Sequence, residues 1–173
     1  MIKKIVSSKD LQIAINDLGI VISNYCKHEG GGIVFICVMK GGFMFFSDLI
    51  KKINYPIEVD FVKCSSYDGF EQKSIEMHYD VEVKVKDKTV FLVDDILDSG
   101  NTMNELKDHY MKLGAKQVET VSAVYKENLD FPNHLFIYKQ PEGVNPWYIG
   151  YGMVGPKGYS RNLDTIYTLW VKK

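Results

Sequence analysis

The chain reads Val90-Phe91-Leu92-Val93-Asp94-Asp95-Ile96-Leu97-Asp98-Ser99-Gly100-Asn101-Thr102 just past its midpoint. The four apolar residues that open this stretch predict a strand of a parallel sheet that is buried on both faces. Acids follow where the strand ends, and the small and hydroxyl-bearing residues after them predict a turn into a helix. Ligands of open α/β sheets bind beyond the carboxyl ends of the strands. The stretch therefore predicts an α/β fold and the edge of the sheet at which its site lies.

Two kinds of ligand group fit this stretch side by side. Asp94 and Asp95 can hold hydroxyl groups or a hydrated Mg²⁺, a hard cation suited to carboxylate oxygen. The turn at 98–102, here called the phosphate turn, supplies unpaired backbone N–H groups at a helix N-terminus, where an anion is stabilised. A ribose 5-phosphate carries a diol and a phosphate in one molecule. The alternative is a strand-turn-helix corner whose acids cap the helix, but a cap explains one acid and not three.

Composition and charge narrow the class of protein. At 173 residues the chain fits one domain with a full core. Lys and Arg (21) nearly balance Asp and Glu (22), so no net basic excess favours nucleic acid. The longest apolar run, 32–39, is too short to span a bilayer, and the first six residues lack the features of a signal peptide. Three cysteines without C-x-x-C spacing indicate neither a disulfide framework nor a zinc site. From the charge balance and the missing span and signal peptide, we expect a cytoplasmic protein that binds neither nucleic acid nor membrane.

Strands and helices alternate along the chain. This alternation predicts a single α/β domain, 1–173, built on a mainly parallel twisted sheet with helices on both faces. Apolar runs predict further strands at 33–38, 57–64 and 117–125. The first helix is expected to have Ser8 as its cap.

Two segments do not fit this alternation. Residues 65–88 form a polar, charged stretch that is too long for an ordinary connection, and we expect a flexible flap there, with a plain surface loop as the alternative. Residues 135–173 contain short aromatic strands separated by prolines, and we expect them to build most of a small hood. The apolar run at 43–46, Phe-Met-Phe-Phe, exceeds one helical face and suggests a buried contact between subunits, so we expect a homodimer or homotetramer.

The sequence at 93–102 closely resembles the 5-phosphoribosyl-1-pyrophosphate (PRPP) signature of the type I phosphoribosyltransferases. The chain is similar to the hypoxanthine-guanine, or 6-oxopurine, members of that family from about residue 33 to residue 161. The resemblance implies a purine salvage enzyme that moves 5-phosphoribosyl from Mg²⁺-bound PRPP to a 6-oxopurine base and releases pyrophosphate. It implies Mg²⁺ binding through Asp94 and Asp95. It also implies PRPP binding through Asp94, Asp95, Asp98, Ser99, Gly100, Asn101 and Thr102.

A second loop, Met-Lys-Gly-Gly at 39–42, follows a buried strand, and its glycines let the backbone approach an anion. A plain tight turn is the alternative. In position the loop resembles the pyrophosphate loop of the same family, which implies a cis peptide bond between Met39 and Lys40. The resemblance further implies pyrophosphate contacts from Lys40 and Gly41. Arg161 matches, one residue further along, the family's pyrophosphate-binding arginine, with a solvated surface arginine as the alternative.

The resemblance also implies a lid and a base site. Ser66 and Tyr67 match a Ser-Tyr pair that closes over the active centre. Lys126 matches the lysine that hydrogen-bonds the purine 6-oxo group, with a surface lysine as the alternative. Trp147 and Tyr148 match an aromatic-aliphatic pair at which the base stacks, although Tyr148 is larger than the usual aliphatic residue.

Asp98 matches the family residue that takes or holds the proton of the incoming purine, which makes it the expected catalytic residue. One departure lies at 153–157, Met-Val-Gly-Pro-Lys, where the family has an aspartate that helps to bind metal and the purine edge. A transferase for xanthine or another base is therefore one alternative. Another is a PRPP-sensing regulatory protein of the same fold, but such proteins usually show a basic surface or an attached DNA-binding domain.

Overall fold

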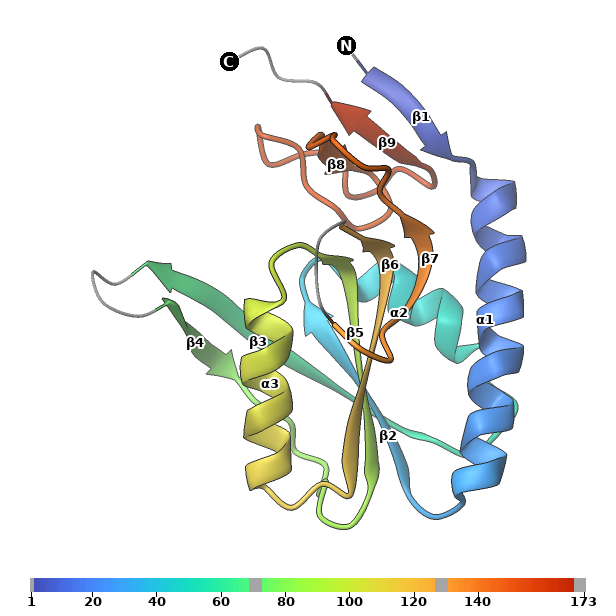
Figure 1. Cartoon of the computed structure of the whole chain (residues 1–173), viewed down its shortest axis with the longest axis vertical. Coiled ribbons are helices and arrows are strands. Elements are labelled where there is room, and N and C mark those ends of the chain that lie inside the picture. Colours follow the sequence, from blue (N-terminus) through green and yellow to red (C-terminus); the bar gives the residue numbers. More distant parts are fainter. Residues whose placement is uncertain (1, 69–72, 127–130, 170–173) are drawn as a thin grey trace.

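The computed structural model describes residues 2–68, 73–126 and 131–169, with only the backbone described at 66–68, 73 and 74. Its centre is a sheet of six strands in the order β4-β3-β2-β5-β6-β7 (Figure 1). Every pairing in this sheet is parallel except that of β3 with β4. The prediction of a mainly parallel sheet is thus confirmed. The strands are β2 (Ile33–Met39), β3 (Glu58–Asp68), β4 (Lys73–Tyr79), β5 (Thr89–Leu97), β6 (Gln117–Tyr125) and β7 (Leu135–Lys139).

Helices cover both faces of the sheet, as predicted. α1 (Ser8–Glu29) and α2 (Phe43–Ile50) contribute to one apolar cluster, and α3 (Asn101–Lys112) contributes to the other. Successive residues of β2 alternate between the two clusters, since Phe35 packs in the first and Ile36 in the second. This burial on both faces explains why the central strands are continuous apolar runs. Within the described ranges, no helix is long and apolar enough to cross a membrane.

The cap of α1 lies one residue earlier than predicted. The Ser7 hydroxyl accepts a hydrogen bond from the N–H of Asp10 at 3.2 Å, and Ser7 has the extended backbone of a cap, with φ −72° and ψ 159°. Ser8 is instead the first helical residue. The reason is that the chain enters the helix from a strand that ends at Val6, which leaves Ser7 as the junction.

The parallel register brings the carboxyl ends of the central strands to one edge. Cys37 of β2 lies opposite Val93 of β5, and Asp94 lies opposite Ser122 of β6. The loops that follow these three strands therefore lie together at that edge. This is the edge at which the sequence places the acids and the phosphate turn.

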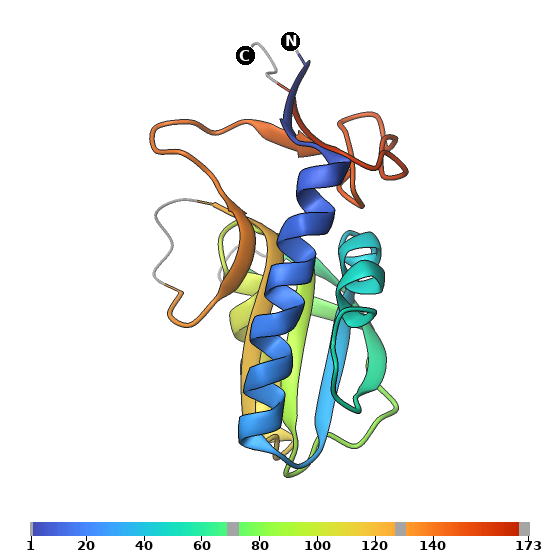
Figure 2. The same cartoon turned by 90° about the vertical axis from the view of Figure 1, so that its right-hand side faces the viewer.

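A small second sheet forms the hood beyond this edge. It contains β1 (Ile2–Val6), β9 (Ile166–Leu169) and β8 (Trp147–Ile149), in that order and antiparallel. Figure 2 shows the first strand in the hood and α1 running from there along the main sheet. The hood differs from the expected segment, 135–173, because β7 joins the main sheet and β1 comes from the other end of the chain. Such pairings depend on contacts between distant segments, which local sequence patterns do not record.

The segment expected to be a flap, 65–88, consists of two different parts. Its first part is a β-hairpin, because β3 continues to Asp68 and pairs with β4; we call this β3–β4 unit the lid hairpin, and it projects from the sheet in Figure 1. Its second part packs against the body of the protein, where Tyr110 of α3 donates a hydrogen bond to Asp80 at 2.9 Å and Val85 is buried. The structure therefore restricts the candidate lid to the hairpin.

Candidate active site

The loop after β2 packs directly against the acidic end of β5. The peptide bond between Met39 and Lys40 is cis, as the resemblance implies, and the Lys40 side chain is exposed. Gly41 touches the Asp95 carboxylate so closely that a Cβ at this position would collide with it. A Cβ on Gly42 would lie 2.9 Å from the carbonyl oxygens of both Val38 and Val93, so the backbone of the two neighbouring strands leaves no room for one. Only glycine permits these approaches, so the loop presents its backbone beside the acids.

Asp94 and Asp95 form a desolvated pair of carboxyl groups. The N–H of Asp95 donates to Oδ1 of Asp94 at 2.8 Å, and the Asp95 side chain is buried. Desolvation raises the pKa of Asp94 well above its usual range, and the negative charge of Asp95 raises it further. Desolvation also raises the pKa of Asp95, although hydrogen bonds and the charge of Arg161 act in the opposite direction. The two acids repel each other when both are ionised, and hydroxyl donors or a cation would relieve that repulsion.

The phosphate turn connects β5 to α3. Gly100 has a φ of 80° directly before the helix, a left-handed conformation that favours glycine, and a Cβ there would lie 3.2 Å from the ring of Phe131. The Ser99 hydroxyl oxygen accepts a long hydrogen bond from the N–H of Asn101 at 3.4 Å. Thr102 lies in the first turn of α3. The turn therefore brings the positive end of a helix dipole, with N–H donors, to the edge that carries the acids.

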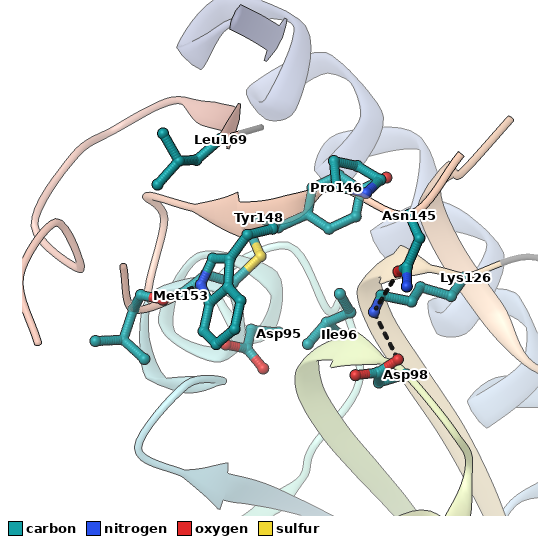
Figure 3. A pocket seen from close by; sticks show the side chains of 11 residues that line it. Asp95, Ile96, Asp98, Lys126, Asn145, Pro146, Tyr148, Met153 and Leu169 are labelled. Atoms are coloured by element: carbon teal, nitrogen blue, oxygen red, sulfur yellow. Dashed lines mark hydrogen bonds and ion pairs between the residues drawn. The ribbon is translucent and has the colours of Figure 1, made fainter. Parts of the chain in front are cut away.

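A cavity of about 480 Å³ opens between this edge and the hood. Its lining includes five residues that the sequence predicted, Asp95, Asp98, Lys126, Trp147 and Tyr148. It also includes six that were not predicted, Ile96, Asn145, Pro146, Met153, Val154 and Leu169. Figure 3 shows the side chains of Asn145, Lys126 and Asp98 on one side of the cavity and the apolar Met153 and Leu169 on the other. Size and lining suit a flat ring with a polar edge.

The polar side of the cavity is organised around Lys126. Its Nζ lies 2.6 Å from Oδ1 of Asp98 and donates to Oδ1 of Asn145 at 3.4 Å. The Lys126 side chain is 17% exposed and that of Asp98 is 66% exposed, so the pair has one face toward solvent. Asn145 is a site residue that the sequence analysis missed. Its only signal was an Asn-Pro pair directly before the predicted aromatic wall.

Trp147 and Tyr148 contribute differently to the wall of the cavity. Trp147 is 49% exposed, and its indole N–H donates to the carbonyl of Val154 at 2.7 Å. Tyr148 is buried, and its hydroxyl donates to Oε1 of Gln140 at 3.2 Å. The protein therefore satisfies the polar groups of both side chains, and the exposed part of the Trp147 ring remains available for stacking.

Arg161 approaches the same edge from the hood. Its Nη1 donates to the carbonyl of Gly152 at 2.6 Å. Gly152, with a φ of 94°, packs on the carbonyl oxygen of Gly41 so closely that a Cβ would collide with it. The structure thus brings Gly41 and Arg161, both predicted to contact pyrophosphate, to one place beside Asp95.

Ser66 and Tyr67 lie on β3 in the part of the lid hairpin where only the backbone is described. Ser66 is opposite Ile75 of β4, and the N–H of Ile75 donates to Oε2 of Glu105 on α3 at 2.9 Å. The hairpin is therefore docked on the helix that follows the phosphate turn. That these two residues close over the cavity stays a prediction.

The donor set at the end of β5 fits a magnesium ion. Asp94 and Asp95 supply hard carboxylate oxygens, and because burial raises the pKa of both groups, a cation beside them would stabilise their ionised form. Among the described residues, no group of three or more His, Cys, Asp or Glu side chains is placed to hold a metal. An ion at this pair would therefore complete its coordination with oxygens of a bound ligand and with water.

Comparisons with known proteins agree with this geometry. Residues 2–148 match the phosphoribosyl transferase domain. A hypoxanthine phosphoribosyltransferase from Buchnera aphidicola is 33% identical over 61% of this chain and 60% of that protein. A hypoxanthine-guanine phosphoribosyltransferase from Aquifex aeolicus is 31% identical over 96% of this chain and 93% of that protein. The crystal structure of a hypoxanthine-guanine phosphoribosyltransferase from Bacillus anthracis superposes with a TM-score of 0.84 at 30% identity, covering 98% of this chain and 99% of that one. Since these matches span most of its length, the chain belongs to the phosphoribosyltransferase family, with hypoxanthine and hypoxanthine-guanine phosphoribosyltransferases among its relatives.

Proposed function

We propose that this protein transfers 5-phosphoribosyl from PRPP to a ring nitrogen of a 6-oxopurine, hypoxanthine or guanine. The products are the nucleoside 5′-monophosphate and pyrophosphate. The observation that carries the proposal is the cavity, because Asp95 of the acid pair and the Lys126–Asp98 ion pair both line it. A sugar diol and a purine edge can thus be held next to each other, as the transfer requires.

Three parts of the site suit the three parts of PRPP. The phosphate turn offers helix N–H groups to the 5′-phosphate, and Asp94 and Asp95 suit the ribose hydroxyls. Lys40, the backbone of Gly41 and Arg161 suit the pyrophosphate. Asp94 and Asp95 would also hold Mg²⁺, which would supply positive charge that stabilises the leaving pyrophosphate.

The reaction separates charge, and the residues are arranged to stabilise both signs. Departure of pyrophosphate breaks the bond at C1′ and leaves positive charge on the ribosyl ring, which the nearby carboxylates of Asp94 and Asp95 stabilise. Lys40 and Arg161 stabilise the negative charge of the leaving group. A lid that excludes water would suppress hydrolysis of PRPP, the competing reaction.

Asp98 and Lys126 act on the base. As the base nitrogen bonds to C1′, Asp98 takes or holds the proton that the purine loses, and Lys126 donates to the 6-oxo group. In the structure the two side chains bond to each other at 2.6 Å. A bound 6-oxopurine offers each of them a replacement partner, an N–H for the carboxylate and an oxygen for the ammonium.

The proposal also includes an oligomeric state and a compartment. Phe43 of α2 and Val59 and Phe61 of β3 are between 41% and 46% exposed, and the ring of Phe46, one turn along from Phe43, lies 5.7 Å from that of Phe61. These side chains form one apolar patch, the α2–β3 patch, which suits a homodimer or homotetramer. The cysteines are unpaired, which supports a reducing, cytoplasmic location.

An assay of the purified protein with PRPP and Mg²⁺ over hypoxanthine, guanine, xanthine, adenine and a pyrimidine tests the function. We expect monophosphate and pyrophosphate in equal amounts with hypoxanthine or guanine. A clear preference for xanthine or another base would assign the chain to that neighbouring activity. Binding of PRPP without turnover on any base would favour a PRPP-sensing regulatory protein.

A further inference from the structure

Gln140 is a buried polar residue at the junction of the two sheets. It directly follows β7 and is only 6% exposed. Its backbone N–H donates to the carbonyl of Tyr125 at 2.8 Å. Its side chain donates from Nε2 to the carbonyl of Val144 at 2.6 Å and accepts at Oε1 from the hydroxyl of Tyr148 at 3.2 Å. One residue thus joins the end of β6, the turn before β8, and β8 itself.

Each of these contacts leads to the wall of the cavity. Tyr125 directly precedes Lys126, Val144 directly precedes Asn145, and Tyr148 is itself part of the lining. Figure 3 shows Lys126 and Asn145 beside Asp98, with Tyr148 further along the wall. Gln140 itself is not among the residues that line the cavity.

We infer that Gln140 is a positioning residue for the purine, which acts through Tyr148 and Asn145 by fixing their distances from Lys126. The inference rests on the proposed function, since it assigns the cavity to the base. It makes no use of contact between Gln140 and substrate. It predicts that the affinity for the base depends on Gln140 while the affinity for PRPP does not.

The physical reason is that no regular secondary structure holds this part of the wall. Residues 140–146, which contain Asn145, form no helix or strand, and they include Pro141, Pro146 and a glycine at a φ of 73°. A buried amide with both of its ends hydrogen-bonded specifies one arrangement of its neighbours. Loss of that amide removes the side-chain donor to the Val144 carbonyl and the acceptor that ties Tyr148 to the turn, and the turn then gains alternative conformations.

The test compares Gln140→Met, Tyr148→Phe and the double variant with the wild type, by measuring KM for hypoxanthine, KM for PRPP, kcat and the melting temperature. We expect Gln140→Met to raise KM for hypoxanthine about 5- to 20-fold and to leave KM for PRPP within about twofold. Tyr148→Phe should raise KM for the base less. In the Gln140→Met background, Tyr148→Phe should raise KM for the base by a smaller factor than it does in the wild type. The bond to Gln140 is then already lost, and only the contact of the Tyr148 hydroxyl with Tyr138 remains to be removed.

Tyr25→Phe is the matched control. This variant also removes one tyrosine hydroxyl that has a side-chain acceptor, since Tyr25 donates to Glu119 at 3.1 Å. Glu119 is near the start of β6, at the end of the strand away from the cavity. We expect this variant to keep the wild-type KM for both substrates. If Gln140→Met fails to fold, Tyr148→Phe carries the same test, because it retains the ring and removes only the donor.

The outcomes distinguish the inference from the proposed function. A wild type that transfers phosphoribosyl to no purine overturns both. If the wild type is active but KM for hypoxanthine in Gln140→Met stays within about twofold of the wild-type value, the inference alone is overturned. The same threshold applies to Tyr148→Phe where that variant carries the test. Equal rises in KM for base and for PRPP also overturn it, because they indicate a general loss of structure. Fully multiplicative effects in the double variant would show that Gln140 does not act through Tyr148.

Discussion

The desolvation of Asp94 and Asp95 should make binding of Mg²⁺ and PRPP sensitive to pH. The pKa of both carboxyl groups is raised, so the free protein keeps a proton on the pair to a higher pH than an exposed acid would. A cation favours the ionised form, and its binding must therefore release that proton. We expect affinity for Mg²⁺ and PRPP to rise as pH rises through the titration of the pair, and to weaken as pH falls through it.

Calorimetry in buffers of different ionisation enthalpy measures the released protons. We expect release of up to about one proton per site from the acid pair. The phosphates of PRPP exchange protons as well, so the Asp94→Asn variant, which keeps the shape of the side chain, provides the baseline. Equal release by the wild type and Asp94→Asn would contradict the prediction.

Lys126 should determine the preference for a 6-oxo group. An oxygen at that position accepts from the ammonium group, whereas the amino group of adenine leaves it unpaired at a cost of about 1–3 kcal/mol. Lys126→Ala should therefore lower kcat/KM for hypoxanthine about 10- to 100-fold and narrow its advantage over adenine. Lys116→Ala is the control: Lys116 directly precedes β6, at the end of the strand away from Lys126, and its Nζ lies 2.8 Å from Oε2 of Glu29. This variant should keep the wild-type preference for hypoxanthine over adenine. An unaltered protein that uses adenine better than hypoxanthine would rule out this role.

At the scale of elements, the lid hairpin and the loop after it are attached to α3 to different degrees. The hairpin is joined to α3 by the bond from Ile75 to Glu105. The loop is joined through Asp80, which lies 2.7 Å from Nε2 of His109 and accepts from Tyr110 at 2.9 Å. Motion is therefore expected in the hairpin and not in the loop.

Hydrogen exchange followed by mass spectrometry tests this difference. Amides of β4 should become protected when PRPP, Mg²⁺ and a base analogue are bound, and those at 81–88 should exchange equally in both states. As a control, Glu105→Ala should speed exchange in β4 without ligand and leave 81–88 unchanged. Equal protection of β4 with and without ligands would show that the hairpin is not a lid.

Elements with a local sequence pattern could be predicted, whereas pairings between distant segments could not. β2 and β5 could be predicted because each is a continuous apolar run, which is typical of a buried parallel strand. The two loop glycines also have local reasons: a Cβ at Gly41 would collide with Asp95, and Gly100 has a positive φ. By contrast, the pairing of β1 with β9 joins opposite ends of the chain. Short segments carry no local signal for such a partner, so the hood could be located only approximately.

Asn145 and Gln140 were missed for a related reason. Both lie in the Pro- and Gly-containing turn between β7 and β8, where a polar residue is typical of any loop. Gln140 becomes important only because the fold brings Tyr148 and the end of β6 against it.

The alternation of Ile75, Met77 and Tyr79 was a local signal for β4, but the charged residues around it obscured that signal.

At the scale of the whole molecule, the site is shared between the two sheets. The main sheet provides the acids, the phosphate turn and Lys126, and the hood provides Trp147 and Arg161. The hood is tied to the main body by Tyr151, whose hydroxyl donates to Asp48 of α2 at 2.8 Å. Because α2 directly follows the loop that carries Gly41, we expect a partner subunit that packs on α2 to restrain this loop as well.

The α2–β3 patch should therefore link assembly to PRPP binding. Phe61→Lys places a charge in the patch, and because Phe61 is 41% exposed, the fold of the subunit should tolerate it. Light scattering after size exclusion should show a dimer or tetramer for the wild type and a smaller species for Phe61→Lys, with a higher KM for PRPP in the variant. Met111→Lys changes a similarly exposed side chain, 44% exposed, on α3, and should keep the wild-type mass and KM. A wild type that is monomeric at assay concentrations would leave the patch without this role, and a dimer unaffected by Phe61→Lys would place the contact elsewhere.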